Sequence, residues 1–173
     1  MKKRFTIAVV LFATLFINSQ TFAQKQYKFG HIDSNELLSM MPERANAKVE
    51  LENYAKQLEN TLMAMQTELE KKYQEYQVSA DSMSPIIRQT KEAELQEMQQ
   101  RMQTFQQSAQ QDLSKKENEL LQPIIAKARK AIDEVAEEGG FIYIFDTGSG
   151  TVLHYSTDSE NILPLVKVKL GIQ

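Results

Sequence analysis

The 173-residue sequence has no cysteine, no tryptophan and only two histidines. Without cysteine the chain has no disulfide framework and no thiol to which a lipid could be attached. His31 and His154 both fall in short segments that we predict to be strands, and no carboxylates with the spacing of metal ligands surround them. We therefore expect both to be packing residues rather than metal ligands or an acid–base pair.

Sequence motifs of catalysis are also missing. Gly148-Ser149-Gly150 is not followed by a helix that opens with Gly-Lys-Ser/Thr, so it predicts a turn and not a phosphate-binding loop. The serines lack the strand–turn–helix context of a nucleophile elbow. The sequence therefore predicts a protein that is not an enzyme, with no cofactor and no metal.

Long apolar runs are scarce, and the main one lies at the N-terminus. It covers Phe5 to Ile17, follows Lys2-Lys3-Arg4 and precedes the small-residue site Thr21-Phe22-Ala23. This arrangement is typical of a cleaved secretory signal, which we place at residues 1–23. A retained anchor is the alternative, but the run is short for a membrane span. We expect a mature protein that is soluble outside the cytoplasm and touches membranes at most peripherally.

Positive charge is in the minority in the mature chain. Cleavage after Ala23 removes three of the 20 basic residues and none of the 23 acidic ones, which leaves 17 against 23 and a net charge of −6. Nucleic-acid binding depends on a basic surface that releases counterions. We therefore expect no nucleic-acid partner.

What the sequence has instead is one very long amphipathic region, residues 42–138. Apolar residues recur there at alternating steps of four and three, which is the spacing of a coiled-coil seam. In an antiparallel hairpin, residues that lie opposite each other have numbers that add up to a constant. The pairs Leu51 with Leu113 and Leu62 with Met102 meet this condition. We predict a helical hairpin whose turn lies near residues 81–85, where Ser84 can cap a helix that starts at Pro85. The predicted seam comprises Leu51, Ala55, Leu58, Leu62, Met65, Leu69, Leu95, Met98, Met102, Phe105, Ala109 and Leu113.

Two prolines stand at nearly the same height of this hairpin. Mirrored through the turn, Pro42 falls beside Pro123. Proline kinks or restarts a helix because it lacks the backbone donor and clashes with the preceding turn. We hypothesise that Pro42 and Pro123 form a hinge at the base of the arm.

The remaining residues, 24–41 and 139–173, form a small body. We predict a strand at Tyr27–Ile32, a short helix capped by Asp33, a helix stop at Gly139-Gly140, and a hairpin of strands 141–145 and 151–155 around a glycine turn. The segment 161–170 fits a helix or a strand, and we favour the helix. The segment 141–145 is apolar on both faces, so both faces of this strand should be covered by other residues. So small a body cannot cover both, which favours oligomerisation through the sheet. The residues expected to mediate it are Phe29, Ile32, Phe141, Ile142, Tyr143, Ile144, Val152 and Leu153.

The tip of the hairpin breaks the apolar pattern. Lys72 occupies a seam position that should be apolar, so the neighbouring apolar residues cannot all be buried between two helices. Flexible thioethers and aromatic rings make an adaptable surface for unrelated apolar partners. Client contact and simple packing of the tip are both open interpretations for Tyr73, Tyr76, Met83, Ile86 and Ile87.

The layout resembles the Skp/OmpH family of periplasmic chaperones over the whole mature chain. The segments that carry this resemblance are short, and their order and spacing matter more than any one of them. They are Phe29-Gly30-His31-Ile32-Asp33 with Leu37-Leu38, Phe141 to Asp146 with Gly150, Val152-Leu153-His154-Tyr155, and Asn161-Ile162 through Val166 to Leu170-Gly171.

The resemblance implies a mainly α-helical α+β fold, in which a coiled-coil tentacle projects from a small β body, and a homotrimer of such subunits. It also implies a periplasmic location and a cavity between the arms that holds unfolded outer-membrane proteins without ATP. The chain departs from the strongly basic arms of well-known members, because acidic residues outnumber basic ones between Glu68 and Glu97. Electrostatic capture of acidic clients or of lipopolysaccharide is therefore in doubt. The alternative function is a structural or adaptor coiled-coil protein of the cell envelope.

Overall fold

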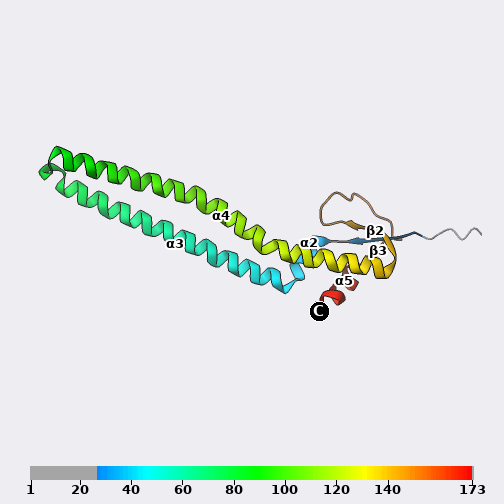
Figure 1. The fold of residues 1–173 in the computed structure, drawn as a ribbon. Coiled ribbons are helices and arrows are strands. Elements are labelled where there is room, and N and C mark those ends of the chain that lie inside the picture. The colour runs from blue at the N-terminus through cyan, green and yellow to red at the C-terminus, as the bar shows by residue number, and fades with distance from the viewer. Residues whose placement is uncertain (1–26, 173) are drawn as a thin grey trace, which may run out of the picture.

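The structure, a computed structural model, describes residues 27–172. Two long helices lie side by side as an arm that projects from a small body of short helices and strands (Figure 1). The expected fold class, a long helical hairpin on a small β body, is confirmed. The predicted signal peptide at residues 1–23 lies outside the described residues. The elements are β1 (Lys28–Ile32), α2 (Ser34–Met40), α3 (Pro42–Ser79), the 3₁₀ turn η1 (Ala80–Ser82), α4 (Pro85–Gly139), β2 (Phe141–Asp146), β3 (Glu160–Asn161) and α5 (Leu163–Leu170).

Local sequence signals account for the ends of the two arm helices. Met41 is extended, with ψ of 124°, and Pro42 begins α3 at a position where a missing backbone donor costs nothing. At the start of α4, the Ser84 hydroxyl accepts a hydrogen bond from the Ile87 amide, and Pro85 is the first helical residue. Gly140 then ends α4 in the left-handed region, at φ of 66°, which glycine adopts without steric cost.

The two arm helices contact each other through the face that carries the predicted seam. Every residue expected in the seam is buried or half-buried, whereas most residues between them are exposed. Ion pairs cross the hairpin from Lys72 Nζ to Glu94 Oε1 at 2.5 Å and from Lys116 Nζ to Glu50 Oε1 at 2.6 Å. Both pairs join residues within one helical turn of the partners that the predicted register assigns.

The sheet differs from the prediction. The expected hairpin of strands 141–145 and 151–155 is wrong for this chain, since residues 151–156 have no regular secondary structure. Instead β2 lies parallel to β1, with Phe29 beside Tyr143 and His31 beside Phe145, and the short strand β3 pairs with the other edge of β1 in the order β2-β1-β3.

Hydrogen bonds at the end of β2 explain this difference. The Asp146 carboxylate accepts from the Ser34 amide at 3.1 Å, from the Ser34 hydroxyl at 2.7 Å and from the Gly148 amide at 3.0 Å. The Thr147 amide donates to Ile32 O at 2.9 Å. These bonds direct the chain after β2 toward the start of α2, and not back along β2.

The hydrophobic core lies in the body, where the last turns of α4 contact both β2 and α5 (Figure 1). The segment that fitted either helix or strand forms α5, with Pro164 in its first turn. Ile32 is only 2% exposed, because it points into this core. Its expected place in an interface between chains is therefore corrected: it packs within its own chain. The core comprises Ile32, Leu37, Met41, Ala47, Ile124, Ala128, Ala131, Val135, Ile162, Leu163 and Val166.

Candidate functional surfaces

The end of the arm carries exposed aliphatic side chains. Of the residues expected at the tip, Ile86 is 71% exposed and Ile87 is 50% exposed, while Tyr76 and Met83 are half-buried. Val78, which the sequence analysis missed, is 90% exposed in the last turn of α3. A signal for it was present, because an aliphatic residue that stands outside the seam beside a predicted turn has no apolar partner. We call Tyr73, Val78, Ile86 and Ile87 the tip surface.

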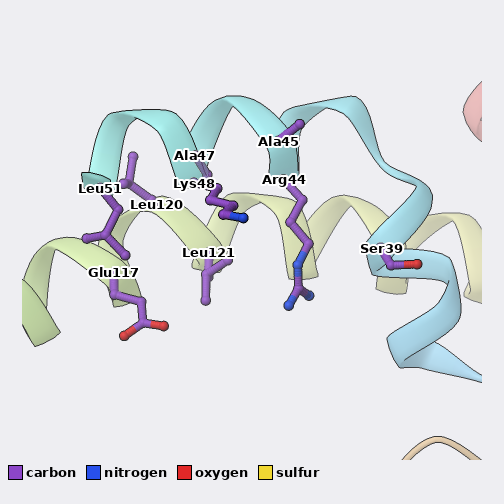
Figure 2. A pocket seen from close by; sticks show the side chains of 9 residues that line it. All are labelled: Ser39, Arg44, Ala45, Ala47, Lys48, Leu51, Glu117, Leu120 and Leu121. Carbon is purple, nitrogen blue, oxygen red and sulfur yellow. The ribbon is translucent and has the colours of Figure 1, made fainter. Parts of the chain in front are cut away.

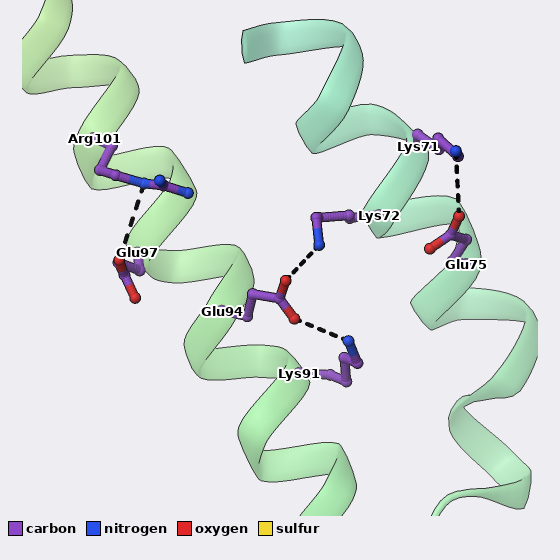
Figure 3. A network of polar contacts seen from close by, with 7 residues as sticks. All are labelled: Lys71, Lys72, Glu75, Lys91, Glu94, Glu97 and Arg101. Carbon is purple, nitrogen blue, oxygen red and sulfur yellow. Dashed lines mark hydrogen bonds and ion pairs between the residues drawn. The ribbon is translucent and has the colours of Figure 1, made fainter.

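Just behind the tip surface, polar contacts replace apolar ones between the helices. Glu94 receives hydrogen bonds from Lys72 at 2.5 Å and from Lys91 at 2.9 Å (Figure 3). The hydrogen bonds from Lys72 and Lys91 lower the pKa of Glu94 from 4.5 to about 2, and the bond to Glu94 raises the pKa of Lys72. The position at which the seam pattern fails thus holds a charged pair that joins α3 to α4.

The helices are also loosely packed beside this pair. The Tyr76 hydroxyl donates to Glu92 Oε1 at 2.5 Å, and this bond raises the pKa of Tyr76. A cleft of about 150 Å³ separates the helices here and is lined by polar residues as well as by Met83 and Leu95. Close seam packing therefore ends near Leu95, and the last turns of the arm are held by polar contacts and by the capped turn.

The base of the arm has a groove that the sequence analysis did not find. Its volume is about 390 Å³, its floor contains Leu51, Leu120 and Leu121, and Arg44 and Lys48 project over it (Figure 2). Small residues at the start of α3, among them Ala45 and Ala47, leave room for it. The spacing of alanines gives no clear sequence signal for a groove, because alanine is also an ordinary seam residue.

The two prolines occupy different structural settings. Pro42 begins α3, whereas Pro123 lies inside the continuous helix α4 with an exposed side chain. Figure 1 shows α4 changing direction between its arm and body portions. A Lys127–Glu43 ion pair joins the two helices at this height. The structure brings the prolines to the base of the arm, and their role as a hinge stays a prediction.

One face of the sheet carries an aromatic cluster. The rings of Phe29 and Tyr143 stack with centroids 6.4 Å apart, and Phe145 lies 6.5 Å from Phe29 and 6.1 Å from Tyr143. All three side chains are exposed at more than two-fifths of their surface. Such a contiguous aromatic face is typical of an interaction surface.

The other residues expected to mediate oligomerisation are divided between surface and core. Ile142 is exposed and Leu153 is 95% exposed, whereas Phe141 and Ile144 are half-buried against the core and Val152 is half-buried in the loop. That loop contacts the sheet through His31, which stacks on Tyr155 at 4.1 Å. His31 Nδ1 also lies 2.9 Å from Ser159 Oγ.

These surfaces define a class of protein: a long, largely polar helical arm with an apolar tip, attached to a small body with an open aromatic face. Within residues 27–172, no group of three His, Asp or Glu side chains is arranged to hold a metal ion. In the same range, no helix is both long and apolar enough to cross a membrane.

Comparison with known proteins agrees with this class. The chain matches the family described as Outer membrane protein (OmpH-like) over residues 28–170, and it belongs to this family of Skp and OmpH-like chaperones. Relatives named Chaperone protein Skp occur in Photorhabdus laumondii subsp. laumondii and in Photorhabdus luminescens. Each is 26% identical over 140 residues, which is 81% of this chain and 83% of the relative.

A solved structure from Caulobacter crescentus CB15, titled as an OmpH-like outer membrane chaperone, has the same fold. It superposes with a TM-score of 0.72 at 14% identity and covers 83% of each chain. The resemblance seen in the sequence is therefore confirmed at the level of family and fold. The family is one of chaperones and not of enzymes.

Proposed function

We propose that this protein is an ATP-independent periplasmic holdase that binds unfolded outer-membrane proteins between helical arms and prevents their aggregation before membrane insertion. The observation that carries the proposal is the arm. Its helices extend far beyond the body, and Val78, Ile86 and Ile87 are exposed at its tip. Membership of a chaperone family supports the same function.

Binding would depend on many weak contacts. The exposed aliphatic and aromatic side chains at the tip can repack around different sequences, and several arms that act on one chain add avidity without any deep pocket. A cavity shared between arms requires more than one subunit. Residues 42–138 would act as the arm, and residues 24–41 and 139–173 as the body that joins the subunits.

The body supports assembly into a homo-oligomer, which we propose is a trimer. The aromatic cluster of Phe29, Tyr143 and Phe145 is open, and both β2 and β3 are edge strands with one unpaired side. Open edges and an open aromatic face favour pairing with further copies. The segment 151–155, with Leu153 almost fully exposed, has the composition of a strand and is available to pair with a neighbouring copy.

A paired measurement tests the proposed function. An outer-membrane protein is diluted from urea into buffer with stoichiometric amounts of the mature protein, and aggregation is followed by turbidity, while light scattering gives the mass of the chaperone alone. We expect slowed aggregation and the mass of three subunits. A structural or adaptor protein would leave aggregation unchanged and would retain one tight partner in a pulldown, and a monomer without effect on aggregation would refute the proposal.

A further inference from the structure

The tip surface, made of Tyr73, Val78, Ile86 and Ile87, has no partner within the described part of the chain. Val78 lies in the last turn of α3 and the two isoleucines lie in the first turn of α4. The turn η1 joins these two helix ends at the far end of the arm (Figure 1). These exposed aliphatic side chains at the far end of a long projection contribute nothing to the core. Exposed apolar side chains gathered at one end of a molecule are typical of a contact site for another molecule.

Most of the cations near this surface already make contacts within the chain. Between residues 57 and 97 the basic residues are Lys71, Lys72, Arg88 and Lys91. Lys72 and Lys91 both bind Glu94, and Lys71 lies 4.0 Å from Glu75 (Figure 3). Arg88 Nη2 donates to Ala80 O at 2.8 Å and closes the turn. Three of these four cations, Lys72, Arg88 and Lys91, therefore hold a contact at 2.9 Å or less within the chain, whereas the exposed Lys71 is only loosely paired.

Most carboxylates of the same stretch, in contrast, have no ion-pair partner among the described residues. Within the described residues, five of them have no cation at ion-pair distance: Glu59, Glu68, Glu70, Asp81 and Glu92. Glu70 accepts only from the neutral amide of Gln66, and Glu92 only from the hydroxyl of Tyr76. Eight carboxylates thus stand against four cations between residues 57 and 97, so the net charge around the apolar tip is negative.

We infer that the tip surface binds unfolded polypeptide segments in which lysine or arginine stands beside apolar side chains, and that it discriminates against acidic segments. The aliphatic side chains supply contact area, and the free carboxylates supply charge complementarity, which sets specificity and association rate. The inference rests on the proposed holdase function and specifies its client class. It also implies that anionic lipid surfaces are not the target of the tip.

The test uses two fluorescent peptides of the same length and apolar residues, one with lysines and the other with glutamates at the intervening positions. Fluorescence anisotropy reports their binding to the mature full-length protein. At about 0.01 M salt, where charges act over about 30 Å, we expect the lysine peptide to bind at least about fivefold more tightly. At about 1 M salt the screening length falls to about 3 Å and the ratio should approach one.

Matched variants assign the effect to the tip. The triple change Glu68→Gln, Glu70→Gln and Asp81→Asn should remove most of the discrimination. A control triple, Glu117→Gln, Asp133→Asn and Glu137→Gln, removes three carboxylates that also lack an ion pair within residues 27–172 but lie near the base, and it should change the ratio less than about twofold. The double change Ile86→Ser and Ile87→Ser should weaken both peptides alike.

Several results would overturn the inference: equal or tighter binding of the glutamate peptide, equal effects of the two triple variants, or binding of vesicles with anionic headgroups that the lysine peptide does not displace. Failure of the holdase function gives a different result. A protein that slows client aggregation but binds both peptides equally remains a holdase without charge selection. A protein that selects the lysine peptide but leaves aggregation unchanged has a peptide-binding tip without holdase function.

Discussion

The arm and the body are stabilised in different ways. All the most deeply buried large side chains, Ile32, Leu37, Met41, Ile162 and Val166, lie in the body. Along the arm beyond its base, only Leu95 and Met98 are buried, and the other seam residues are half-buried. The body thus buries a few apolar side chains almost completely, whereas the arm buries many apolar side chains only in part. Single substitutions should therefore damage the body far more than the arm.

The largest effect is expected for Leu37→Ala in the body. Leu37 has 0% exposure, and truncation of such a side chain removes its burial and leaves a cavity, at a cost of about 2–5 kcal/mol in the free energy of unfolding. Chemical denaturation followed by circular dichroism measures it. Val168→Ala, at a position of α5 that is 80% exposed, is the matched control and should change little. Equal effects of both changes would mean that the described core is wrong.

A smaller effect of opposite sign is expected for Pro123→Ala. Proline inside a helix is about 3 kcal/mol less favourable than alanine in model helices, and tertiary packing reduces the difference. We expect a gain of about 1–3 kcal/mol in the free energy of unfolding, and a narrower distribution of distances between spin labels on the arm and on the body. The change Pro42→Ala alone should do less, because that proline begins α3. A distance distribution that is unchanged after both substitutions would remove the hinge hypothesis.

The same contrast explains what the sequence could predict. The arm is specified by local spacing, so its boundaries and register follow from the apolar steps, the Ser84 cap and the prolines. The pairing of β2 with β1 depends on contacts between distant residues, such as Ser34 and Asp146, and no local pattern reveals those. The open segment 151–155 has the alternation of a strand, but a strand forms only where an edge is available to pair with it.

The candidate surfaces were predictable to different degrees. Lys72 at an apolar seam position correctly marked the place where close packing ends, and Ile86 and Ile87 followed from it. Val78 and the groove beneath Arg44 and Lys48 depend on how far apart the helices lie, which the register alone does not determine. The expectation that Ile32 lies in the interface fails because alternation cannot tell which face of a strand its own chain covers.

The smallest effect is expected at the charged pair in the arm, as a change in pH dependence. Since the pKa of Glu94 is lowered from 4.5 to about 2 in the folded arm, its ionised form is the one that folding favours. Its contribution to stability is then complete above the unfolded pKa, decreases as pH falls below about 4.5, and is lost near pH 2. Thermal unfolding midpoints of the wild type and of Glu94→Gln should therefore differ at pH 7 and converge by pH 2.

The control for this comparison is Glu97→Gln, one turn away on α4, whose carboxylate lies 4.0 Å from Arg101 Nε at an exposed site (Figure 3). Exposed pairs of this kind contribute little, so the Glu97→Gln midpoints should follow those of the wild type at every pH. A Glu94→Gln difference that persists at pH 2, or one matched by Glu97→Gln, would show that Lys72 and Glu94 do not form a specific contact. The end of the arm would then be held by the seam, the Tyr76–Glu92 hydrogen bond and the capped turn, without a contribution from this pair.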